Sequence, residues 1–239
     1  MMNISLTAMV LAAGFGKRLG DITKNTPKPL VTISNTCCLD LSVNALKQVG
    51  FRRIIINTHY HANQIEEHVK RHNDIEIILS YEPILLETAG GIRKVLPEFE
   101  NKPFVVVNAD MYWQDTNPSI IHQVADAFQD SDNFCMAVTP LKNAKGHSGK
   151  GDFVFENKLL RKPTEDDLEA SRYVYIGIQV INPRVIEPLK IEPLALPRFY
   201  KEAVEKKALR GVIFDGTWID VGNVDGLILA RNLTPTPYI

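Results

Sequence analysis

The sequence has almost no net charge and no long hydrophobic run. Its 27 Lys and Arg residues nearly balance its 28 Asp and Glu residues, which leaves a formal net charge of −1. Without a global electrostatic field, the chain as a whole does not attract nucleic acid or anionic membranes. The longest apolar runs have about six residues, whereas a membrane span needs about 20. We therefore expect no nucleic-acid partner and no membrane partner, and any phosphate binding must come from a local cluster of basic groups.

Cysteine is also scarce, with three residues in 239. Cys37 and Cys38 are adjacent, a spacing unsuited to an ordinary disulfide, and Cys135 stands alone in an apolar run. Nothing around them supports a cysteine nucleophile, and small thiols in the core are the default. Residues 1–11 carry no cationic residue ahead of their short apolar run, unlike a secretory signal. These features predict a reduced, cytoplasmic protein.

A regular alternation of strand and helix patterns fills the first half of the chain. Short apolar runs typical of buried parallel strands lie at residues 6–12, 53–57, 76–80, 104–108 and 134–139. Patterns long enough for crossover helices separate them, at residues 39–49, 61–72, 89–96 and 118–129. This rhythm predicts an α/β fold with a doubly wound, mostly parallel, Rossmann-like sheet and helices on both faces. Ligands of such sheets bind beyond the carboxyl ends of the strands.

The pattern changes after about residue 140. Residues 151–156, 158–161 and 173–181 are typical of antiparallel strands covered on one face, and residues 196–207 and 223–232 are typical of helices. No internal repeat or low-complexity segment is present. We expect one domain over residues 1–233, in which the half at 1–140 carries the binding crevice and a small antiparallel extension in the half at 141–233 caps it. Residues 234–239 are expected to be a C-terminal tail.

The most informative string is Leu-Ala-Ala-Gly-Phe-Gly-Lys-Arg-Leu at residues 11–19, directly after the first predicted strand. Its small residues let the backbone approach a ligand closely, and backbone N–H groups in such a turn can cradle phosphate oxygens. Arg18 adds a planar fork suited to phosphate, and Lys28 adds a point charge within Thr-Pro-Lys-Pro-Leu at residues 26–30. A lone Gly-x-Gly is more often a tight surface turn with solvated cations. The string is neither a dinucleotide-binding fingerprint nor a Walker loop.

Taken together, these strings resemble those of the sugar-1-phosphate nucleotidyltransferases, whose signature is Leu-Ala-Ala/Gly-Gly-x-Gly-x-Arg-Leu/Met followed by Pro-Lys-Pro-Leu. The resemblance continues in the family's order to about residue 230. Within the family, the chain is most similar to the short N-acetylmuramate 1-phosphate uridylyltransferases of peptidoglycan recycling. Four strings carry this narrower likeness: Leu-Glu-Thr-Ala-Gly-Gly-Ile at 86–92, Gly-Lys-Gly-Asp-Phe at 149–153, Tyr-Ile-Gly-Ile at 175–178 and Trp-Ile-Asp-Val-Gly at 218–222.

The resemblance implies a glycosyltransferase-A-like fold and a transferase reaction. A sugar 1-phosphate would attack the α-phosphorus of a nucleoside triphosphate and release pyrophosphate. The expected substrates are UTP and N-acetylmuramate 1-phosphate, and the expected cofactor is Mg²⁺. Asp110, at the end of an apolar strand, and Asp220 are expected to hold the metal. Arg18 is expected to hold the leaving pyrophosphate, and Lys28 the two reacting phosphates.

Further site residues follow from the same resemblance. The nucleotide-binding half, residues 1–140, is expected to hold the nucleotide through Leu11, Ala12, Ala13, Gly14, Gly16, Lys17, Arg18, Lys28, Glu87, Gly90, Gly91 and Asn108. The sugar-binding half, residues 141–233, is expected to bind the sugar through Asp152, Gly177 and Lys162. The chain departs from its relatives at Ala109, where they usually have glycine, and alanine disfavours a backbone with positive φ. The protein is expected to be a monomer or a small homo-oligomer.

Two groups of histidines invite a functional interpretation. His68 and His72 stand four apart on a predicted helix, a spacing that can chelate zinc. Residues 69–71 are Val-Lys-Arg, so the glutamate of a metalloprotease helix is missing and two cations crowd the pair. A solvated helix face is therefore the favoured interpretation. His59 and His61, after the second strand, are interpreted as capping or turn residues rather than pocket residues.

Several functional alternatives stay open. The nearest is a guanylyl- or cytidylyltransferase acting on mannose 1-phosphate, another hexose phosphate or phosphocholine. A catalytically silent nucleotide-sensing subunit is a different class. Such subunits tend to lose the metal carboxylates or the loop arginine, yet Arg18, Lys28, Asp110 and Asp220 are all present. An NAD-binding Rossmann enzyme is the remaining alternative.

Overall fold

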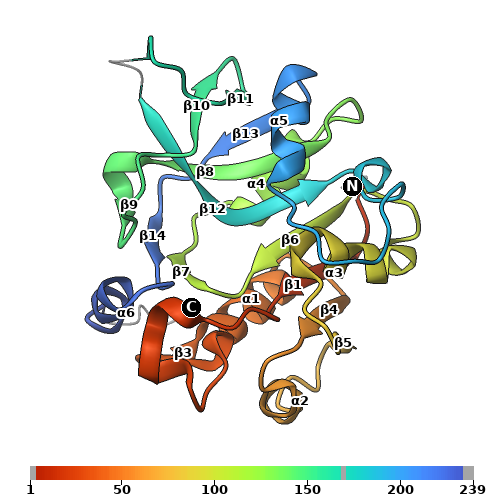
Figure 1. The fold of residues 1–239 in the computed structure, drawn as a ribbon, viewed down its shortest axis with the longest axis vertical. Helices are drawn as coiled ribbons and strands as arrows, with labels where there is room; N and C mark the ends of the chain where they lie inside the picture. The colour runs from red at the N-terminus through yellow and green to blue at the C-terminus, as the bar shows by residue number, and fades with distance from the viewer. Residues whose placement is uncertain (1–3, 168–170, 234–239) are drawn as a thin grey trace.

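The structure is a computed structural model that describes residues 4–167 and 171–233. Its centre is a nine-stranded sheet with the strand order β10-β11-β13-β8-β12-β6-β1-β4-β5, and helices cover both of its faces (Figure 1). The strands from β6 to β5 are parallel to one another, and β8 pairs in parallel with β13. The predicted α/β fold with a doubly wound, mostly parallel sheet is confirmed.

The strands predicted from apolar runs are all present. The large sheet contains β1 (Thr7–Leu11), β4 (Arg53–Thr58), β5 (Glu76–Tyr81), β6 (Phe104–Asn108), β8 (Phe134–Pro140), β10 (Phe153–Glu156), β11 (Leu159–Arg161), β12 (Arg172–Ile181) and β13 (Leu209–Ile213). A second sheet contains β7 (Met111–Gln114), β14 (Thr217–Asp220) and β9 (Ala144–Lys145), and a small hairpin contains β2 (Thr32–Ile33) and β3 (Thr36–Cys37). The sequence analysis did not predict β13 or the strands of the two smaller sheets.

The predicted helices are also present, with ends shifted by a few residues. They are α1 (Cys38–Gln48), α2 (Ala62–Val69), α3 (Glu87–Val95), α4 (Ile120–Ala127), α5 (Arg198–Glu205) and α6 (Val224–Arg231). Short 3₁₀ helices are η1 (Lys17–Thr23), η2 (Lys28–Leu30), η3 (Leu96–Phe99), η4 (Leu141–Asn143) and η5 (Pro183–Val185). Within the described residues, the helices are too short or too polar to serve as a membrane span.

Alternation of side chains along the strands divides the core into two layers. In β1, Ala8 and Val10 point to the layer that α1 and α4 cover, whereas Met9 points to the layer that α3 and α5 cover. The neighbouring parallel strands repeat this alternation, and their residues are fully buried on both faces. A near-continuous apolar run is therefore the pattern that a parallel strand covered on both sides requires.

The second half of the chain inserts an antiparallel strand into the sheet. β12 lies between β6 and β8 and runs antiparallel to both, as predicted for residues 173–181. β10 pairs with β11 and also with β12, so the pairings β10-β11-β13-β8-β12 close into a ring. This ring forms the upper part of the molecule in Figure 1, on the opposite side of β12 from the parallel strands.

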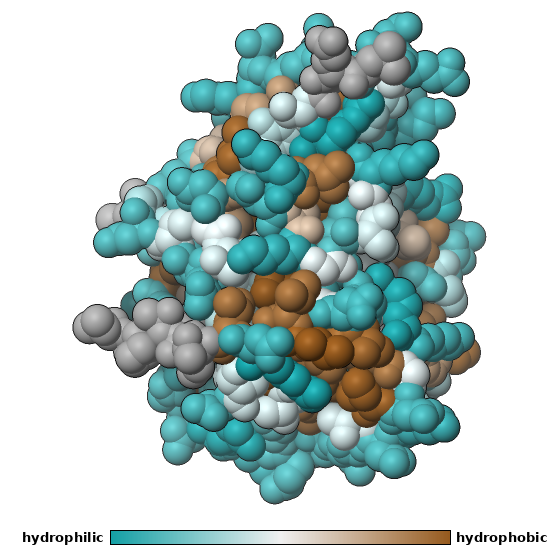
Figure 2. Space-filling view, turned by 90° about the vertical axis from the view of Figure 1, so that its left-hand side faces the viewer, coloured by the Kyte–Doolittle hydropathy of each residue, from teal (hydrophilic) through white to brown (hydrophobic). Residues whose placement is uncertain are grey.

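The second sheet joins segments from the two halves of the chain. β7 follows directly after β6, and β14 pairs antiparallel with it so that Asp220 lies opposite Met111. α6 follows β14 and exposes Val224, Ile228 and Leu229 to solvent. On the side of the molecule that carries α6, apolar side chains gather in the lower half (Figure 2). The pairing of β7 with β14 brings Asp220 to the edge of the parallel sheet.

Arg210, in β13, forms a buried ion pair whose loss should destabilise the fold. Its Nε and Nη2 atoms donate to the two carboxylate oxygens of Asp132 at 2.6 and 3.2 Å, and the Asp132 side chain is 2 % exposed. Arg210→Ala would leave that carboxylate buried and unpaired, so we expect a loss of about 3–5 kcal/mol in the free energy of unfolding. Arg53→Ala is the matched control, because Arg53 pairs with Glu76 and Glu98 at the surface, and it should cost less than about 1 kcal/mol. Urea unfolding of both variants measures the difference, and equal losses would contradict the prediction.

Candidate active site

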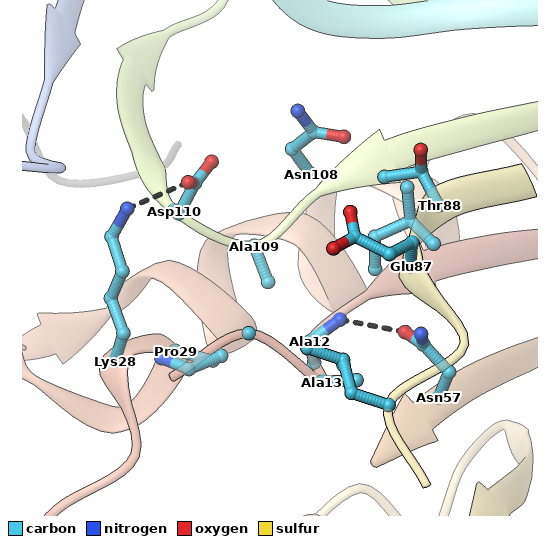
Figure 3. A pocket seen from close by; sticks show the side chains of 13 residues that line it. Ala12, Ala13, Lys28, Pro29, Asn57, Glu87, Thr88, Asn108, Ala109 and Asp110 are labelled. Atoms are coloured by element: carbon cyan, nitrogen blue, oxygen red, sulfur yellow. Dashed lines mark hydrogen bonds and ion pairs between the residues drawn. The ribbon is translucent and has the colours of Figure 1, made fainter. Parts of the chain in front are cut away.

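A cavity of about 190 Å³ lies beyond the carboxyl ends of β1, β4 and β6 (Figure 3). The register of the sheet places it there, because Leu11 at the end of β1 lies opposite Asn57 of β4 and Asn108 of β6. The residues that line it are Leu11, Ala12, Ala13, Gly14, Lys28, Pro29, Asn57, Leu85, Glu87, Thr88, Asn108, Ala109 and Asp110. The structure thus brings together most of the predicted nucleotide-binding residues, whereas Gly16, Lys17, Arg18, Gly90 and Gly91 are outside the lining.

The glycine-rich loop after β1 is tied down at both of its ends. At its start, the Ala12 N–H donates to Asn57 Oδ1 at 2.8 Å. Near its end, Gly16 adopts a left-handed backbone conformation with φ 66°, and a Cβ there would lie 2.9 Å from the Cβ of Lys28. The Gly16 carbonyl oxygen accepts from the Leu19 N–H and from the Thr23 hydroxyl, each at 3.0 Å. Glycine at position 16 is required both for this conformation and for the close approach to Lys28.

Asn57 and Glu82 hold the start of the loop in place, and neither was predicted from the sequence as a site residue. The amide nitrogen of Asn57 donates to Glu82 Oε1 at 2.8 Å, and the Leu86 N–H donates to Glu82 Oε2 at 2.8 Å. Glu82 is fully buried. This network connects the ends of β1, β4 and β5 with the segment before α3. The available signal was position, since both polar residues stand at or directly after the end of an apolar strand.

Lys28 and Asp110 form the central ion pair of the site. Pro27 and Pro29 flank Lys28, which is the first residue of η2 and is 8 % exposed. Its Nζ donates to Asp110 Oδ2 at 2.6 Å, and the Asp110 side chain is 42 % exposed. Figure 3 shows the lysine reaching up to the carboxylate at the rim of the cavity. A largely buried ammonium group is therefore fixed next to a carboxylate that a ligand can reach.

Asp220 comes to the same edge from the other half of the chain. It pairs with Met111 across β14 and β7, and Asp110 is the residue before Met111. Asp220 Oδ1 accepts from the Gly222 N–H at 2.7 Å, and Oδ2 lies 3.8 Å from Nη1 of Arg18. The Asp220 side chain is 18 % exposed. The two carboxylates predicted to hold one metal ion thus lie close in the ladder, since Asp220 is opposite Met111 and Asp110 directly precedes Met111.

Ala109 fits the backbone between these residues without strain. Its φ lies outside the left-handed region, and its N–H donates to the Leu11 carbonyl oxygen at 3.1 Å. Because its side chain is fully buried, alanine is accommodated where relatives usually have glycine. The Ala109 backbone thus does not need the conformation that glycine would favour.

The first residue of α3, Glu87, brings a carboxylate to the cavity. Glu87 has a φ of 60°, which is uncommon outside glycine, and its side chain lies over the Ala12–Ala13 backbone in Figure 3. The segment around Leu194, later in the same chain, fixes this turn, because the Leu194 N–H donates to the Leu86 carbonyl oxygen at 3.0 Å. A conformation of this kind persists where the surrounding structure determines it.

Gly90 and Gly91 have a packing role in this structure. Both are buried in α3. A Cβ at Gly90 would collide with the Glu192 carbonyl oxygen, and a Cβ at Gly91 would lie 2.7 Å from Glu82 Oε1. The two glycines therefore let the segment after η5 and the Asn57–Glu82 network approach the helix closely. Gly90 and Gly91 were expected to contact the nucleotide directly. They are not among the residues that line the cavity, so that role stays a prediction.

The predicted sugar-binding residues lie in two places. Asp152 Oδ2 accepts from the Tyr175 N–H at 3.0 Å, and Lys162 Nζ donates to the Asp152 carbonyl oxygen at 3.3 Å and lies 4.3 Å from the centroid of the Phe153 ring. Gly177, with φ 84°, stands at the bulge of β12, where a Cβ would collide with the Met111 sulfur. Asp152 and Lys162 are therefore neighbours, and Gly177 faces the segment that follows β6.

Tyr175 is a further candidate that sequence reasoning passed over. Its hydroxyl oxygen is buried and has no hydrogen-bond partner among the described residues. Burial raises the pKa of this hydroxyl well above its ordinary value, and the charges of Tyr200 and Asp110 add to the increase. The Tyr175 N–H binds the Asp152 carboxylate, so this tyrosine adjoins a predicted sugar-binding residue. A buried polar atom without a partner is suited to a ligand hydroxyl.

The histidine and cysteine predictions have mixed outcomes. His59 Nδ1 lies 2.7 Å from the Glu82 carbonyl oxygen, and His61 Nε2 lies 2.9 Å from the Lys24 carbonyl oxygen, as expected of turn residues. All three cysteines are free and buried, as predicted. The prediction that His68 and His72 form a solvated helix face is wrong, because their side chains are only 14 % and 8 % exposed.

Comparison with known proteins places this site in a family. The model of the nucleotidyl transferase family matches residues 7–236. The chain is 27 % identical over 231 residues to an N-acetylmuramate alpha-1-phosphate uridylyltransferase from Caulobacter vibrioides, covering 94 % of this chain and 95 % of that protein. It is 26 % identical over 223 residues to the mannose-1-phosphate guanylyltransferase catalytic subunit beta of Drosophila melanogaster, covering 90 % of this chain and 59 % of that protein. A crystal structure of apo-UDP-glucose pyrophosphorylase has the same fold, with a TM-score of 0.75, 20 % identity, and coverage of 95 % of this chain and 96 % of that one.

Asn57 should be essential for holding the glycine-rich loop. Asn57→Ala would leave the Ala12 N–H and the buried Oε1 atom of Glu82 each without the partner that Asn57 supplies, so we expect a loss of at least about 2 kcal/mol in the free energy of unfolding. The Ala12 amide should also exchange its hydrogen faster under native conditions. Urea unfolding and amide exchange by NMR measure the two effects. Asn63→Ala, on the exposed face of α2, is the control and should change neither. Unchanged Ala12 protection in Asn57→Ala would refute the proposed support.

Proposed function

Because this chain belongs to the nucleotidyl transferase family and is a sugar-1-phosphate nucleotidyltransferase, we propose that it joins N-acetylmuramate 1-phosphate to UTP. The products are the UDP-sugar and pyrophosphate. A sugar phosphate oxygen forms a new bond to the α-phosphorus of UTP. The bond between that phosphorus and the oxygen leading to the β-phosphate breaks, and pyrophosphate leaves with the bonding electrons. The phosphate nucleophile is already ionised near neutral pH, so positioning and charge neutralisation carry the catalysis.

The nucleotide is proposed to bind in the cavity of the half at residues 1–140. The backbone of the glycine-rich loop lines its floor, where N–H groups can face phosphate oxygens. Glu87 and Asn108 line the cavity and offer an acceptor and an amide to the nucleotide. Lys28 lines the cavity, and Arg18, 65 % exposed, lies outside the lining, beside Asp220. This arrangement supports the proposal that Lys28 binds the reacting phosphates and that Arg18 binds the leaving pyrophosphate.

The carboxylates of Asp110 and Asp220 fit a magnesium ion. Both offer the hard oxygen ligands that Mg²⁺ prefers, and both are partly exposed, so phosphate oxygens and water can complete the coordination. When bound, the ion would supply positive charge that neutralises the phosphate oxygens in the transition state. The ion pair of Asp110 with Lys28 and the hydrogen bond of Asp220 from Gly222 hold the two carboxylates in place for this role.

The sugar is proposed to bind along β12, in the half at residues 141–233. Asp152 and Lys162 lie side by side at the start of this subsite, and the backbone of Tyr175, whose hydroxyl is buried without a partner among the described residues, binds Asp152. Gly177 lies closest to the metal carboxylates, since it packs against Met111. The lysine ammonium suits a sugar that carries a carboxylate, as N-acetylmuramate does.

The choice of UTP and N-acetylmuramate 1-phosphate rests on the relative from Caulobacter vibrioides, together with the four strings of the sequence that carry the narrower likeness. The three buried free thiols are consistent with a reducing, cytoplasmic compartment. Mannose 1-phosphate with GTP is the second candidate, because the Drosophila melanogaster relative matches 90 % of the chain.

A substrate screen tests the proposed reaction directly. Pyrophosphate release is measured with UTP, GTP, CTP and dTTP against N-acetylmuramate 1-phosphate, mannose 1-phosphate, glucose 1-phosphate and phosphocholine, with and without Mg²⁺. We expect kcat/KM for UTP with N-acetylmuramate 1-phosphate to exceed every other pair by about 100-fold or more. Turnover that does not need UTP would exclude the proposed substrate, and nucleotide binding without pyrophosphate release would favour the sensing subunit.

Substitution of the charged residues tests the site. Asp110→Asn, Asp220→Asn and Lys28→Met should each lower kcat by about 10²–10³-fold, because each removes charge that faces the reacting phosphates. Asp74→Asn is the matched control, since Asp74 forms a comparable surface ion pair with Lys47, and it should leave kcat unchanged. Activities within a few-fold of the parent enzyme in all three site variants would show that the reaction occurs elsewhere.

A further inference from the structure

A second group of ligand-type side chains lies outside the cavity, between the beginning of α1 and the end of α2. Asp40 Oδ1 is 2.8 Å from Nε2 of His68 and 2.8 Å from Nε2 of His72. Cys37 Sγ is 3.6 Å from His68 Nε2. The potential ligand atoms of Cys37, Asp40 and His68 all lie within 4.8 Å of one another. The side chains of Cys37, before α1, Asp40, in α1, and His68, in α2, therefore converge on one point, and His72, just after α2, binds the same Asp40 oxygen.

The geometry of this cluster is close to that of a tetrahedral zinc site. Zinc binds sulfur at about 2.3 Å and nitrogen at about 2.05 Å, which separates a sulfur and a nitrogen ligand by about 3.6 Å. The observed separation between Cys37 Sγ and His68 Nε2 is 3.6 Å. Two oxygen or nitrogen ligands would be about 3.3 Å apart in the same geometry, so the contact from Asp40 to His68 needs to open by only about 0.5 Å. The Nε2 atom of His68 already points to the shared centre.

The cluster also has the burial that a structural metal site requires. Cys37 is 4 % exposed, the Asp40 and His68 side chains are each 14 % exposed, and the His72 side chain is 8 % exposed. Burial raises the pKa of the Cys37 thiol to about 12, and the Asp40 carboxylate contributes to the increase. Metal binding would replace the thiol proton, which leaves to solvent.

The two cations beside the histidines do not oppose a metal ion here. Lys70 is directed away, since its Nζ pairs with Glu67 at 2.5 Å and its side chain is 65 % exposed. Arg71 is 60 % exposed, and its Nη1 lies 3.7 Å from Oδ2 of Asp40, the oxygen opposite to the one that the histidines share. A thiolate and a carboxylate together carry two negative charges, which balance one divalent ion.

We propose that Cys37, Asp40 and His68 bind one zinc ion that fastens α1 to α2, while His72 holds the Asp40 carboxylate in place. The site is separate from the carboxylates of Asp110 and Asp220, and all of its ligands come from the half at residues 1–140. Because α1 packs against η2, which carries Lys28, the metal would stabilise the support of the catalytic lysine rather than take part in the reaction. The proposal does not depend on the identity of the nucleotide or of the sugar.

Cobalt substitution tests the proposal through a spectroscopic readout. The full chain, freed of metal with a chelator, is titrated with Co²⁺, which takes the place of zinc in such sites. We expect one equivalent to bind with a thiolate-to-cobalt charge-transfer band, and Zn²⁺ to displace it. Cys37→Ser should abolish the band, and His68→Gln and His72→Gln should each weaken binding at least about 10-fold. Zn²⁺ should raise the melting temperature of the parent chain and not that of Cys37→Ser.

Matched controls separate this site from other metal binding. Cys135→Ala and His122→Gln change a cysteine and a histidine outside the cluster and should keep the band. Asp110→Asn should keep it too, because the magnesium carboxylates are not part of the site. Asp40→Asn keeps the size of the side chain and should still weaken Co²⁺ binding, which covers the case in which Cys37→Ser does not fold. A band that persists in Cys37→Ser, or a parent chain that gives no thiolate band, would overturn the proposal.

Discussion

A buried ammonium group is the constraint on which the active site depends. The Lys28 side chain is 9 % exposed, and a charge removed from water in this way needs a partner of opposite sign. Asp110 is that partner, at 2.6 Å. Pro27 and Pro29 restrict the backbone on either side, and the glycine at position 16 lets the loop close over the lysine. In the proposed reaction, phosphate oxygens become a second counter-charge for the same ammonium group, so one fixed cation serves both the carboxylate and the substrate.

The sheet determines where this pair can act. Parallel neighbours place Leu11, Asn57 and Asn108 at one edge, so the loop after β1, its support from β4 and the residues after β6 meet without further folding. The second carboxylate needs a longer path through the chain. Asp220 reaches the edge only because β14 pairs with β7, the strand that directly follows Asp110. A ladder between segments more than 100 residues apart therefore sets the distance between the two carboxylates.

Local patterns predicted these parallel strands because each has an apolar run at its centre, which in β1, β4 and β6 is buried on both faces. They did not predict β13, whose residues 209–213 include an arginine and a glycine and whose parallel pairing with β8 depends on the distant chain. The charged site residues were predicted from a resemblance, which fixes residue types and leaves their surroundings open. Asn57 and Glu82 were missed for a similar reason, since a buried amide–carboxylate contact between the ends of two strands leaves no local pattern. Gly90 and Gly91 were predicted as nucleotide contacts, but in the structure they allow close packing against α3 and do not line the cavity.

His68 and His72 show why spacing alone is a weak guide to a ligand site. The lysine and arginine between them suggested a solvated face, yet α2 ends at Val69, so the residues from 70 to 72 do not continue one helical face. In the structure the two cations lie at the surface while the histidines turn inward to Asp40. The chain thus has two ligand sets of different chemistry. Exposed carboxylates at the sheet edge suit a hard ion that shares its coordination with phosphate, whereas a buried set with thiol and imidazole suits an ion enclosed by protein alone. Since exchange with substrate requires open positions and mechanical support does not, the difference in burial supports the proposed roles, catalysis for the first set and stability for the second.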